Sequence, residues 1–123
     1  MLKTEVVAII GASDKEKRYA HMAMHFLIEQ GHQVVLINPS KEMIAGHQCY
    51  ASVSQYNGKI DTITLYVNPK RFQEHLAAVI KVAPKRVIMN PGTEDDALEE
   101  ILVEHGIEVQ HACTLVLLST GKF

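Results

Sequence analysis

Long apolar segments are missing from this sequence. The N-terminal run of residues 6–10 is far shorter than the ~20 apolar residues that a membrane-spanning helix needs, and we expect no signal peptide. Cysteine is scarce as well, because Cys49 and Cys113 are the only two. A disulfide framework is therefore excluded, and reduced thiols are favoured over a single bridge. These absences predict a cytoplasmic protein without a membrane partner.

An excess of positive charge is also missing. The 123 residues include 12 basic and 14 acidic side chains, for a net charge of −2, so the chain has no general affinity for a phosphate backbone and nucleic acid is not an expected partner. The 47% of hydrophobic residues is too high for a disordered chain. Repeats, low-complexity tracts and linkers are absent, which predicts a single domain over residues 1–123.

The apolar pattern alternates between the periods typical of strands and of helices. Continuous β-branched and aliphatic runs predict buried strands over residues 6–10, 34–37, 60–67, 86–89 and 107–109. Spacings of three and four predict helices over residues 18–30, 70–82 and 93–104, the last with Thr93 as its N-cap. A short segment around Cys49 and Tyr50 is compatible with an extended chain, and residues 112–118 fit either a short helix or an edge strand.

This alternation predicts an α/β fold of the Rossmann-like kind. We expect a three-layer, doubly wound sheet of five parallel strands in the order 3-2-1-4-5, with helices on both faces. Ligands bind such sheets outside the carboxyl ends of the strands, at the topological switch point. The residues that follow each strand are therefore the candidates for a functional site.

The segment after the first strand has features of an anion-binding turn. Gly11 allows a tight turn into a helix, whose first N–H groups can meet an anion, while Ser13, Lys15 and Arg18 add a hydroxyl and positive charge. Ser13 and Glu16 stand where the dinucleotide-binding fingerprint has glycines. A solvated turn with a run of charges is the competing interpretation.

The segment after the second strand is more informative. It reads Asn38-Pro39-Ser40-Lys41, and the nearest acidic residue is Glu42, whereas NAD-binding domains place an acid here for the ribose hydroxyl. Lys41 instead suits a ligand with an extra ribose phosphate, such as NADP or coenzyme A. An ordinary Asn-Pro turn is the alternative.

Two later strands end in the same dipeptide. Asn68-Pro69 and Asn90-Pro91 follow the strands at 60–67 and 86–89. Proline ends strand pairing, and asparagine can bond the neighbouring backbone or a ligand edge. Because the three dipeptides belong to the same edge of the expected sheet, we predict that they share a role facing the ligand.

In their order along the chain, these motifs resemble the small stand-alone CoA-binding domain proteins. The resemblance covers nearly the whole chain. The fold that it implies is similar to that of the N-terminal CoA-binding domain of the succinyl-CoA synthetase α subunit. The resemblance is carried by residues 7–13, by residues 31–35 leading to Asn38-Pro39, by Gly46 with Tyr50, Ser52 and Val53, by Asp61 and Val67, and by residues 90–93 with Gly106.

The resemblance implies that the chain binds coenzyme A or an acyl-CoA, and it distributes the site residues. The phosphates would meet Gly11, Ala12, Ser13 and the stretch from Lys15 to Arg18, with Tyr19 beside them. The phosphorylated ribose would lie near Asn38, Pro39 and Lys41. The adenine would border Val67, Asn68 and Pro69, and the pantetheine would approach Asn90, Pro91 and Gly92. Tyr19-Ala20 departs from the family, since many relatives have proline and serine there.

Other reactive side chains do not form a recognisable motif. His21 and His25 share a helix face, but they lack the glutamate of the metalloprotease pattern and an identifiable third ligand, so no metal is predicted. His111 and Cys113 are one residue apart without a visible orienting group. We therefore predict no catalytic residues.

The sequence thus favours non-catalytic binding of coenzyme A or an acyl-CoA, with any acyl chemistry supplied by another chain. The partners that we expect are a second copy in a homodimer or a separate enzymatic subunit. An NADP-binding oxidoreductase or sensor fragment is the first alternative. The second is a structural or interaction module without a ligand, in which a side chain such as Tyr19 or Met22 fills the pocket.

Overall fold

The computed structural model describes residues 4–123, which form an α/β fold around a seven-stranded sheet in the order β3-β4-β2-β1-β5-β6-β7. The strands are β1 (Val6–Ile10), β2 (Gln33–Ile37), β3 (Met43–Ile44), β4 (His47–Tyr50), β5 (Thr62–Leu65), β6 (Arg86–Met89) and β7 (Glu108–His111). The helices are α1 (Tyr19–Glu29), the 3-10 helix η1 (Val53–Gln55), α2 (Pro69–Gln73), α3 (Leu76–Val82), α4 (Asp96–Glu104) and α5 (Thr114–Ser119).

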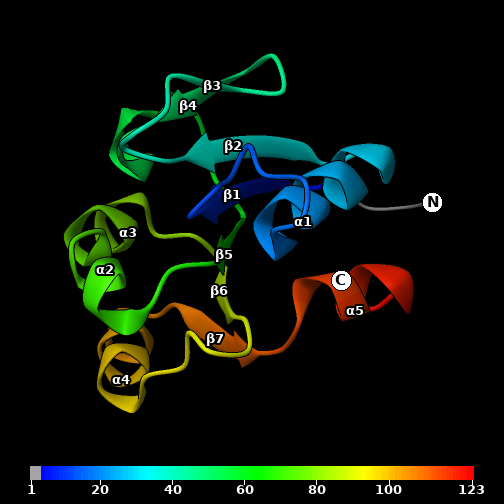
Figure 1. Ribbon diagram of the computed structural model, residues 1–123. Helices are drawn as coiled ribbons and strands as arrows, with labels where there is room; N and C mark the ends of the chain where they lie inside the picture. Colours follow the sequence, from blue (N-terminus) through cyan, green and yellow to red (C-terminus); the bar gives the residue numbers. More distant parts are fainter. Residues whose placement is uncertain (1–3) are drawn as a thin grey trace.

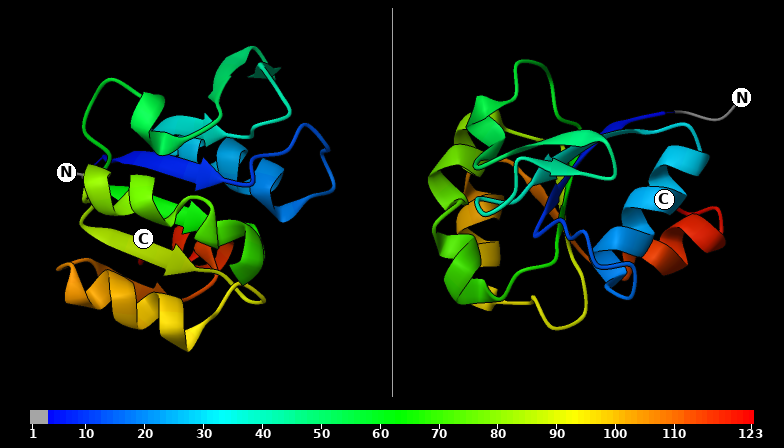
Figure 2. Two further views of the ribbon diagram at one scale, coloured as in Figure 1. Left: turned by 90° about the vertical axis from the view of Figure 1, so that its left-hand side faces the viewer. Right: turned by 45° about the horizontal axis from the view of Figure 1, so that its top comes forward.

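Helices cover both faces of the sheet, as expected for a doubly wound fold. Figures 1 and 2 show α1 and α5 on one face and α2, α3 and α4 on the other. Each face has its own buried apolar cluster, the one under α1 including Ile9 and Leu27 and the other including Ile10 and Phe72. The three-layer arrangement predicted from the alternating pattern is confirmed.

The central strands end at one level, which determines where a site can form. Ile10 of β1 pairs with Ile37 of β2 and with Leu65 of β5, and Leu65 pairs with Met89 of β6. The next residue of each chain segment therefore stands at the same edge of the sheet. Because β1 is buried between its two neighbours, the loop that leaves it starts in the middle of this edge.

The predicted number and order of the strands were wrong. The sheet has seven strands rather than five, and it is mixed, because β3 runs antiparallel to β4. The extra pair is a two-residue hairpin across Ala45 and Gly46, both with positive φ, which suits the twist of a tight β-hairpin. Strands as short as β3 and β4, in which only Ile44 and Cys49 are buried, give little apolar signal.

The strand beside β2, on the side away from β1, is not the one that we predicted. Segment 60–67 was expected beside β2, but β4 lies there and β5 pairs with the opposite side of β1. The burial explains the exchange. All four residues of β5 are buried, as a central strand requires, whereas β4 exposes His47 and Gln48 and suits a place near the edge.

Several helix boundaries also differ from those predicted. The helix expected over 70–82 is two helices, α2 and α3, separated at Glu74 and His75. Helix α4 is capped by Asp95, which accepts a hydrogen bond from the Leu98 N–H at 2.9 Å, and not by Thr93. The undecided segment 112–118 contains helix α5. Within residues 4–123, no helix has the length and apolar character to cross a membrane.

Candidate functional site

A cavity of about 580 Å³ lies at the carboxyl ends of β2, β1 and β5. Its walls come from the loop after β1 and the start of α1, from the turn after β2, from the chain after β5 and from the end of α2. The lining residues are Gly11, Ala12, Ser13, Asp14, Lys15, Arg18, Tyr19, Ala20, Asn38, Pro39, Lys41, Tyr66, Val67, Arg71, Glu74 and His75.

The topology explains why a cavity opens at this point. The connection from β1 to β2 runs through α1 on one face, while the connection from β5 to β6 runs through α2 and α3 on the other. The chain segments that leave β1 and β5 therefore diverge to opposite faces and leave a crevice between them, which is the switch-point position where doubly wound sheets bind ligands.

The loop after β1 is held tightly between its neighbours. The N–H groups of Gly11 and Ala12 both donate to the Ile37 carbonyl, at 3.1 and 3.2 Å, and the Asn38 amide donates to the Ala12 carbonyl at 2.8 Å. Gly11 has a φ of +94°, and a Cβ placed on it would lie 2.7 Å from the Tyr66 carbonyl oxygen. The Gly11 backbone therefore lies so close to Tyr66, the residue after β5, that no side chain fits between them.

The start of α1 presents N–H groups to the cavity. Arg18 occupies the N-cap position in an extended conformation and makes no side-chain capping bond. The first N–H groups of a helix have no acceptor within it, and Tyr19 and Ala20 line the cavity. Since the Gly11 and Ala12 N–H groups are already bonded, the N-terminus of α1 is the part of this loop suited to an anion.

The charges around the cavity differ in sign from the net charge of the chain. Lys15, Arg18, Lys41 and Arg71 are basic, and only Asp14 and Glu74 among the lining residues are acidic. The Lys41 Nζ lies 3.0 Å from a carboxylate oxygen of Asp14, and this hydrogen bond holds the pKa of Asp14 below its ordinary value. Both side chains remain about half exposed, so the pair is weak.

Part of the cavity wall is less polar. Val67 lines the cavity with Tyr66, whose pKa is raised by burial to about 12, so its phenol stays protonated. The Tyr66 hydroxyl is buried and has no hydrogen-bond partner among residues 4–123. Burial also lowers the pKa of His75, which favours a neutral imidazole at pH 7. A flat, uncharged ring is the kind of group that this wall can contact.

The structure gathers most, though not all, of the residues proposed from the sequence. Ten of them line the cavity: Gly11, Ala12, Ser13, Lys15, Arg18, Tyr19, Asn38, Pro39, Lys41 and Val67. Five do not: Asn68, Pro69, Asn90, Pro91 and Gly92. A ligand contact for this second set stays a prediction.

Each of the three strand-end asparagines is engaged within the protein. The Asn38 side chain accepts from the Ser40 N–H in addition to its bond to Ala12. The Asn68 side chain caps α2 by accepting from the Arg71 N–H at 2.8 Å. Asn90 is 3% exposed and bonds Thr64, Leu65 and Thr114. Of the three Asn-Pro pairs, only Asn38-Pro39 borders the cavity.

The sequence reasoning missed a group of lining residues. These are Asp14, Ala20, Tyr66, Arg71, Glu74 and His75. Tyr66 directly precedes Val67, and Asp14 lies between Ser13 and Lys15. Because their neighbours were predicted to contact the ligand, the sequence could have indicated these two residues as well. Arg71, Glu74 and His75 come from the place where the expected helix breaks, which apolar periodicity does not reveal.

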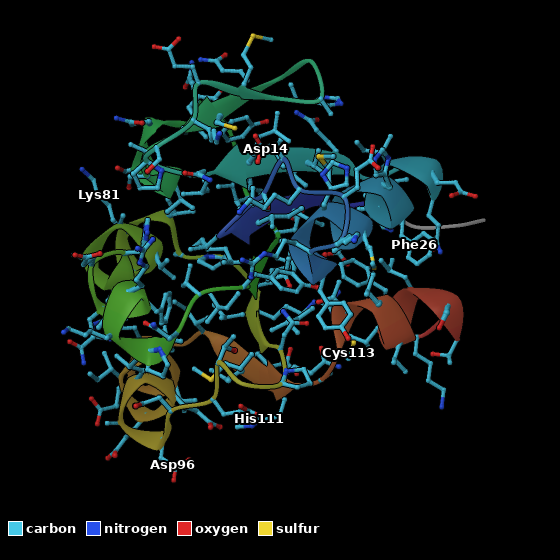
Figure 3. The ribbon with its side chains drawn as sticks, in the orientation of Figure 1. Asp14, Phe26, Lys81, Asp96, His111 and Cys113 are labelled. Atoms are coloured by element: carbon cyan, nitrogen blue, oxygen red, sulfur yellow. The ribbon has the colours of Figure 1, made fainter. Side chains whose placement is uncertain are left out.

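The reactive pair at the end of β7 lies outside this cavity. The His111 Nε2 is 2.6 Å from a Glu99 carboxylate oxygen, at the surface of α4. Cys113 is a free thiol at the N-cap of α5. Figure 3 shows both side chains below the level of Asp14, on the β7 side of the molecule.

A protein family and a solved structure match this chain over nearly its whole length, and a curated protein matches about half of it. A family model described as a CoA binding domain matches residues 5–119. The crystal structure of an uncharacterized protein is 38% identical, with a TM-score of 0.92, over 99% of this chain and 100% of that one. The uncharacterized protein YneT of Bacillus subtilis (strain 168) is 23% identical over 64 residues, which are 52% of this chain and 47% of that protein.

A larger protein shares the fold alone. The dinucleotide-forming acetyl-coenzyme A synthetase 1 of Ca. Korarchaeum cryptofilum is similar over 88% of this chain and 25% of its own, with a TM-score of 0.76 and 21% identity. The similar region is thus one part of that longer chain.

Proposed function

The chain belongs to the CoA-binding domain family, and on that premise we propose that it binds coenzyme A or an acyl-CoA in the cavity at the end of β1 without acting on it chemically. The cavity, of about 580 Å³, falls within the range of pockets for small molecules, roughly 300–1,000 Å³. The whole chain would then serve as one nucleotide-binding unit.

One observation carries the proposal: an uncapped helix N-terminus and four basic side chains surround a single cavity. The N–H groups at the start of α1 suit the diphosphate of coenzyme A. Lys41, in the turn after β2, suits the ribose phosphate, and the carboxylate beside it, that of Asp14, is already paired with Lys41. The wall of Tyr66, Val67 and His75 suits the adenine.

The remaining part of the ligand would leave the cavity along the sheet edge. Asn90, Pro91 and Gly92 stand at the same edge, after β6, and we propose that the pantetheine arm approaches them. Residues for acyl chemistry would come from a second copy or from a separate enzymatic chain. The two free cysteines fit a reducing, cytoplasmic setting.

NADP is the second candidate, because it also carries a diphosphate and a ribose phosphate that Lys41 could contact. In a module without a ligand, we expected Tyr19 or Met22 to fill the pocket, and neither side chain does so. Tyr19 is 68% exposed and Met22 is 37% exposed, and the cavity between α1 and α2 stays open.

The proposal predicts stabilisation by coenzyme A above that by related nucleotides. At a concentration of 100 times its dissociation constant, coenzyme A should raise the free energy of unfolding by ~2.7 kcal/mol. Dephospho-CoA and NAD, which lack the ribose phosphate, should bind more weakly. Thermal unfolding with each nucleotide, followed by calorimetric titration, measures both effects.

Variants of two exposed lysines provide the control. Lys41→Ala should remove the preference for coenzyme A over dephospho-CoA, whereas Lys81→Ala, on α3 and away from Asp14 in Figure 3, should keep it. A stronger response to NADP than to coenzyme A would favour the second candidate. No response to any of the four nucleotides would overturn the proposal.

A second prediction concerns the acidic side chain beside Lys41. Asp14→Asn should tighten the binding of coenzyme A by about threefold, because the carboxylate competes with a phosphate for Lys41 and repels it. The gain should shrink as salt is added. Calorimetric titration at low and high salt measures it.

The matched control removes one negative charge elsewhere. Asp96, at the start of α4, is exposed and lies far from Asp14 in Figure 3. Asp96→Asn should leave the affinity nearly unchanged. Equal gains from the two substitutions would assign the effect to net charge and not to the Asp14–Lys41 pair.

A further inference from the structure

A second hollow on the outer side of α1 contains two histidines. Its volume is about 290 Å³, and it is lined by Glu16, His21, Met22, His25 and Phe26. None of these residues lines the larger cavity. Figure 3 labels Phe26 on α1, on the side of the helix away from α2 and α3. The hollow is therefore a separate place on the surface.

The His21 imidazole is held in the orientation of a metal ligand. Its Nδ1 lies 2.8 Å from the Ser13 carbonyl oxygen, and because a carbonyl only accepts, Nδ1 carries the hydrogen. In this tautomer the ring presents the lone pair of Nε2. The side chain is 6% exposed, so packing keeps it in place. A ring N–H donated to a backbone carbonyl is the usual support of a metal-binding histidine.

His25 brings a second nitrogen to the same point. It lies one helical turn after His21, and the two Nε2 atoms are 3.0 Å apart, with His25 donating to the His21 lone pair. Two nitrogens at this separation, each ~2.0–2.1 Å from one ion, subtend about 90° at it. This is the angle between neighbouring ligands in square-planar and octahedral coordination. His25 is exposed, so its ring can turn to aim its lone pair at the ion.

We propose that His21 and His25 bind one divalent transition-metal ion through their Nε2 atoms. The proton now on the His25 Nε2 moves to its Nδ1 by tautomer exchange, so both nitrogens become donors without a change of net charge. Glu16 adds a negative charge to the same hollow. Among residues 4–123 no group of three His, Cys, Asp or Glu side chains is arranged around an ion, so water completes the coordination.

The geometry and the ligand type select the class of metal. Imidazole suits copper, nickel and zinc, whereas magnesium and calcium prefer oxygen. The near-right angle fits Cu²⁺ and Ni²⁺ better than the tetrahedral preference of Zn²⁺, and the general order of affinities places Cu²⁺ above Ni²⁺. The proposed site is therefore one for Cu²⁺ or Ni²⁺, with weaker binding of Zn²⁺.

Calorimetric titration of the tag-free chain with nickel chloride tests the site without any nucleotide. We expect one ion per chain in the wild type and at least a tenfold loss of affinity in His25→Ala, while magnesium chloride gives no heat of binding. The Cu²⁺ complex should show hyperfine coupling to two imidazole nitrogens in its electron paramagnetic resonance spectrum. Because His25 is exposed, the variant should stay folded, and losing the hydrogen bond to His21 should lower its melting temperature by at most a few degrees when no metal is present.

His47→Ala is the matched control, since His47 is an exposed histidine on β4, outside the hollow. It should bind nickel as the wild type does. Nickel affinity that is unchanged in His25→Ala, or that falls equally in His47→Ala, would overturn the proposal, as would the absence of binding by the wild type. None of these outcomes bears on the binding of coenzyme A, which involves other residues.

Discussion

Gly11→Ala is expected to lower the free energy of unfolding by roughly 3 kcal/mol and to weaken the binding of coenzyme A more than tenfold. The added Cβ would lie 2.7 Å from the Tyr66 carbonyl oxygen and 2.8 Å from a methyl carbon of Val67. Since one of these atoms is backbone in a neighbouring segment, the loop itself must shift. That shift displaces the start of α1 from the cavity. Urea unfolding and calorimetric titration measure the two losses.

Gly92→Ala separates the steric clash from the backbone conformation. Gly92 has nearly the same φ, +93°, but a Cβ there meets no atom within 4 Å. Its substitution should cost about 1 kcal/mol, from the positive φ alone. If the two variants were equally stable, the close approach of Gly11 to β5 would have no energetic weight.

The importance of Gly11 shows what the sequence reveals and what it hides. A glycine directly after a buried apolar run predicts a tight turn, and this prediction is confirmed by its φ of +94°. The atoms that it must avoid belong to Tyr66 and Val67, more than fifty residues later. Their proximity depends on β5 pairing with β1, and the strand order predicted from sequence placed that segment elsewhere.

Strands were predictable where apolar side chains fill them. β1, β2, β5 and β6 have buried β-branched or aliphatic residues and were located within a few positions. The extended segment expected around Cys49 and Tyr50 is confirmed as part of β4. The hairpin that β4 forms with β3 was missed, because both strands are short and only Ile44 and Cys49 are buried in them. There the signal is the turn, Ala45-Gly46, and not the strands.

The lining of the cavity was predictable on the side of α1 and not on the side of α2. Lys15, Arg18 and Lys41 stand out as charges directly after apolar strands. Arg71 and His75 reach the cavity only because α2 ends after Gln73 and the chain turns before α3. Asn68 and Pro69, whose ligand contacts stay a prediction, start α2, and Arg71 in that helix lines the cavity.

Asn90→Ala is expected to be the most destabilising change at the three strand-end asparagines, by roughly 3–5 kcal/mol. The Asn90 amide donates to the Thr64 hydroxyl and to the Leu65 carbonyl, both at 2.7 Å, and its oxygen accepts from the Thr114 N–H at 2.9 Å. The residue is 3% exposed, so water cannot replace these partners. The substitution leaves a buried carbonyl and a buried N–H unpaired between β5, β6 and α5.

Asn68→Ala is the matched control, because it also removes an asparagine side chain that directly precedes a proline. Asn68 is exposed and makes one capping bond, so its loss should cost about 1 kcal/mol. Urea unfolding of both variants gives the comparison. A similar cost at the two positions would show that the Asn90 side chain does not join the strands to α5.

Asn90→Asp extends the test through its pH dependence. The introduced carboxylate keeps an acceptor for Thr114 but turns an oxygen toward the Leu65 carbonyl, where only a protonated carboxyl can donate. Burial and this contact raise its pKa in the folded state above the ~3.9 of an unfolded chain. Its penalty relative to the wild type should therefore grow as the pH rises from about 4 to 7, since the unfolded chain releases the proton first. Asp14 and Glu94, whose pKa values are lowered, are present in both proteins, so their own pH dependence cancels from this comparison. A penalty that stayed constant with pH would mean that the Asn90 amide hydrogen bonds contribute little to joining β5 and β6.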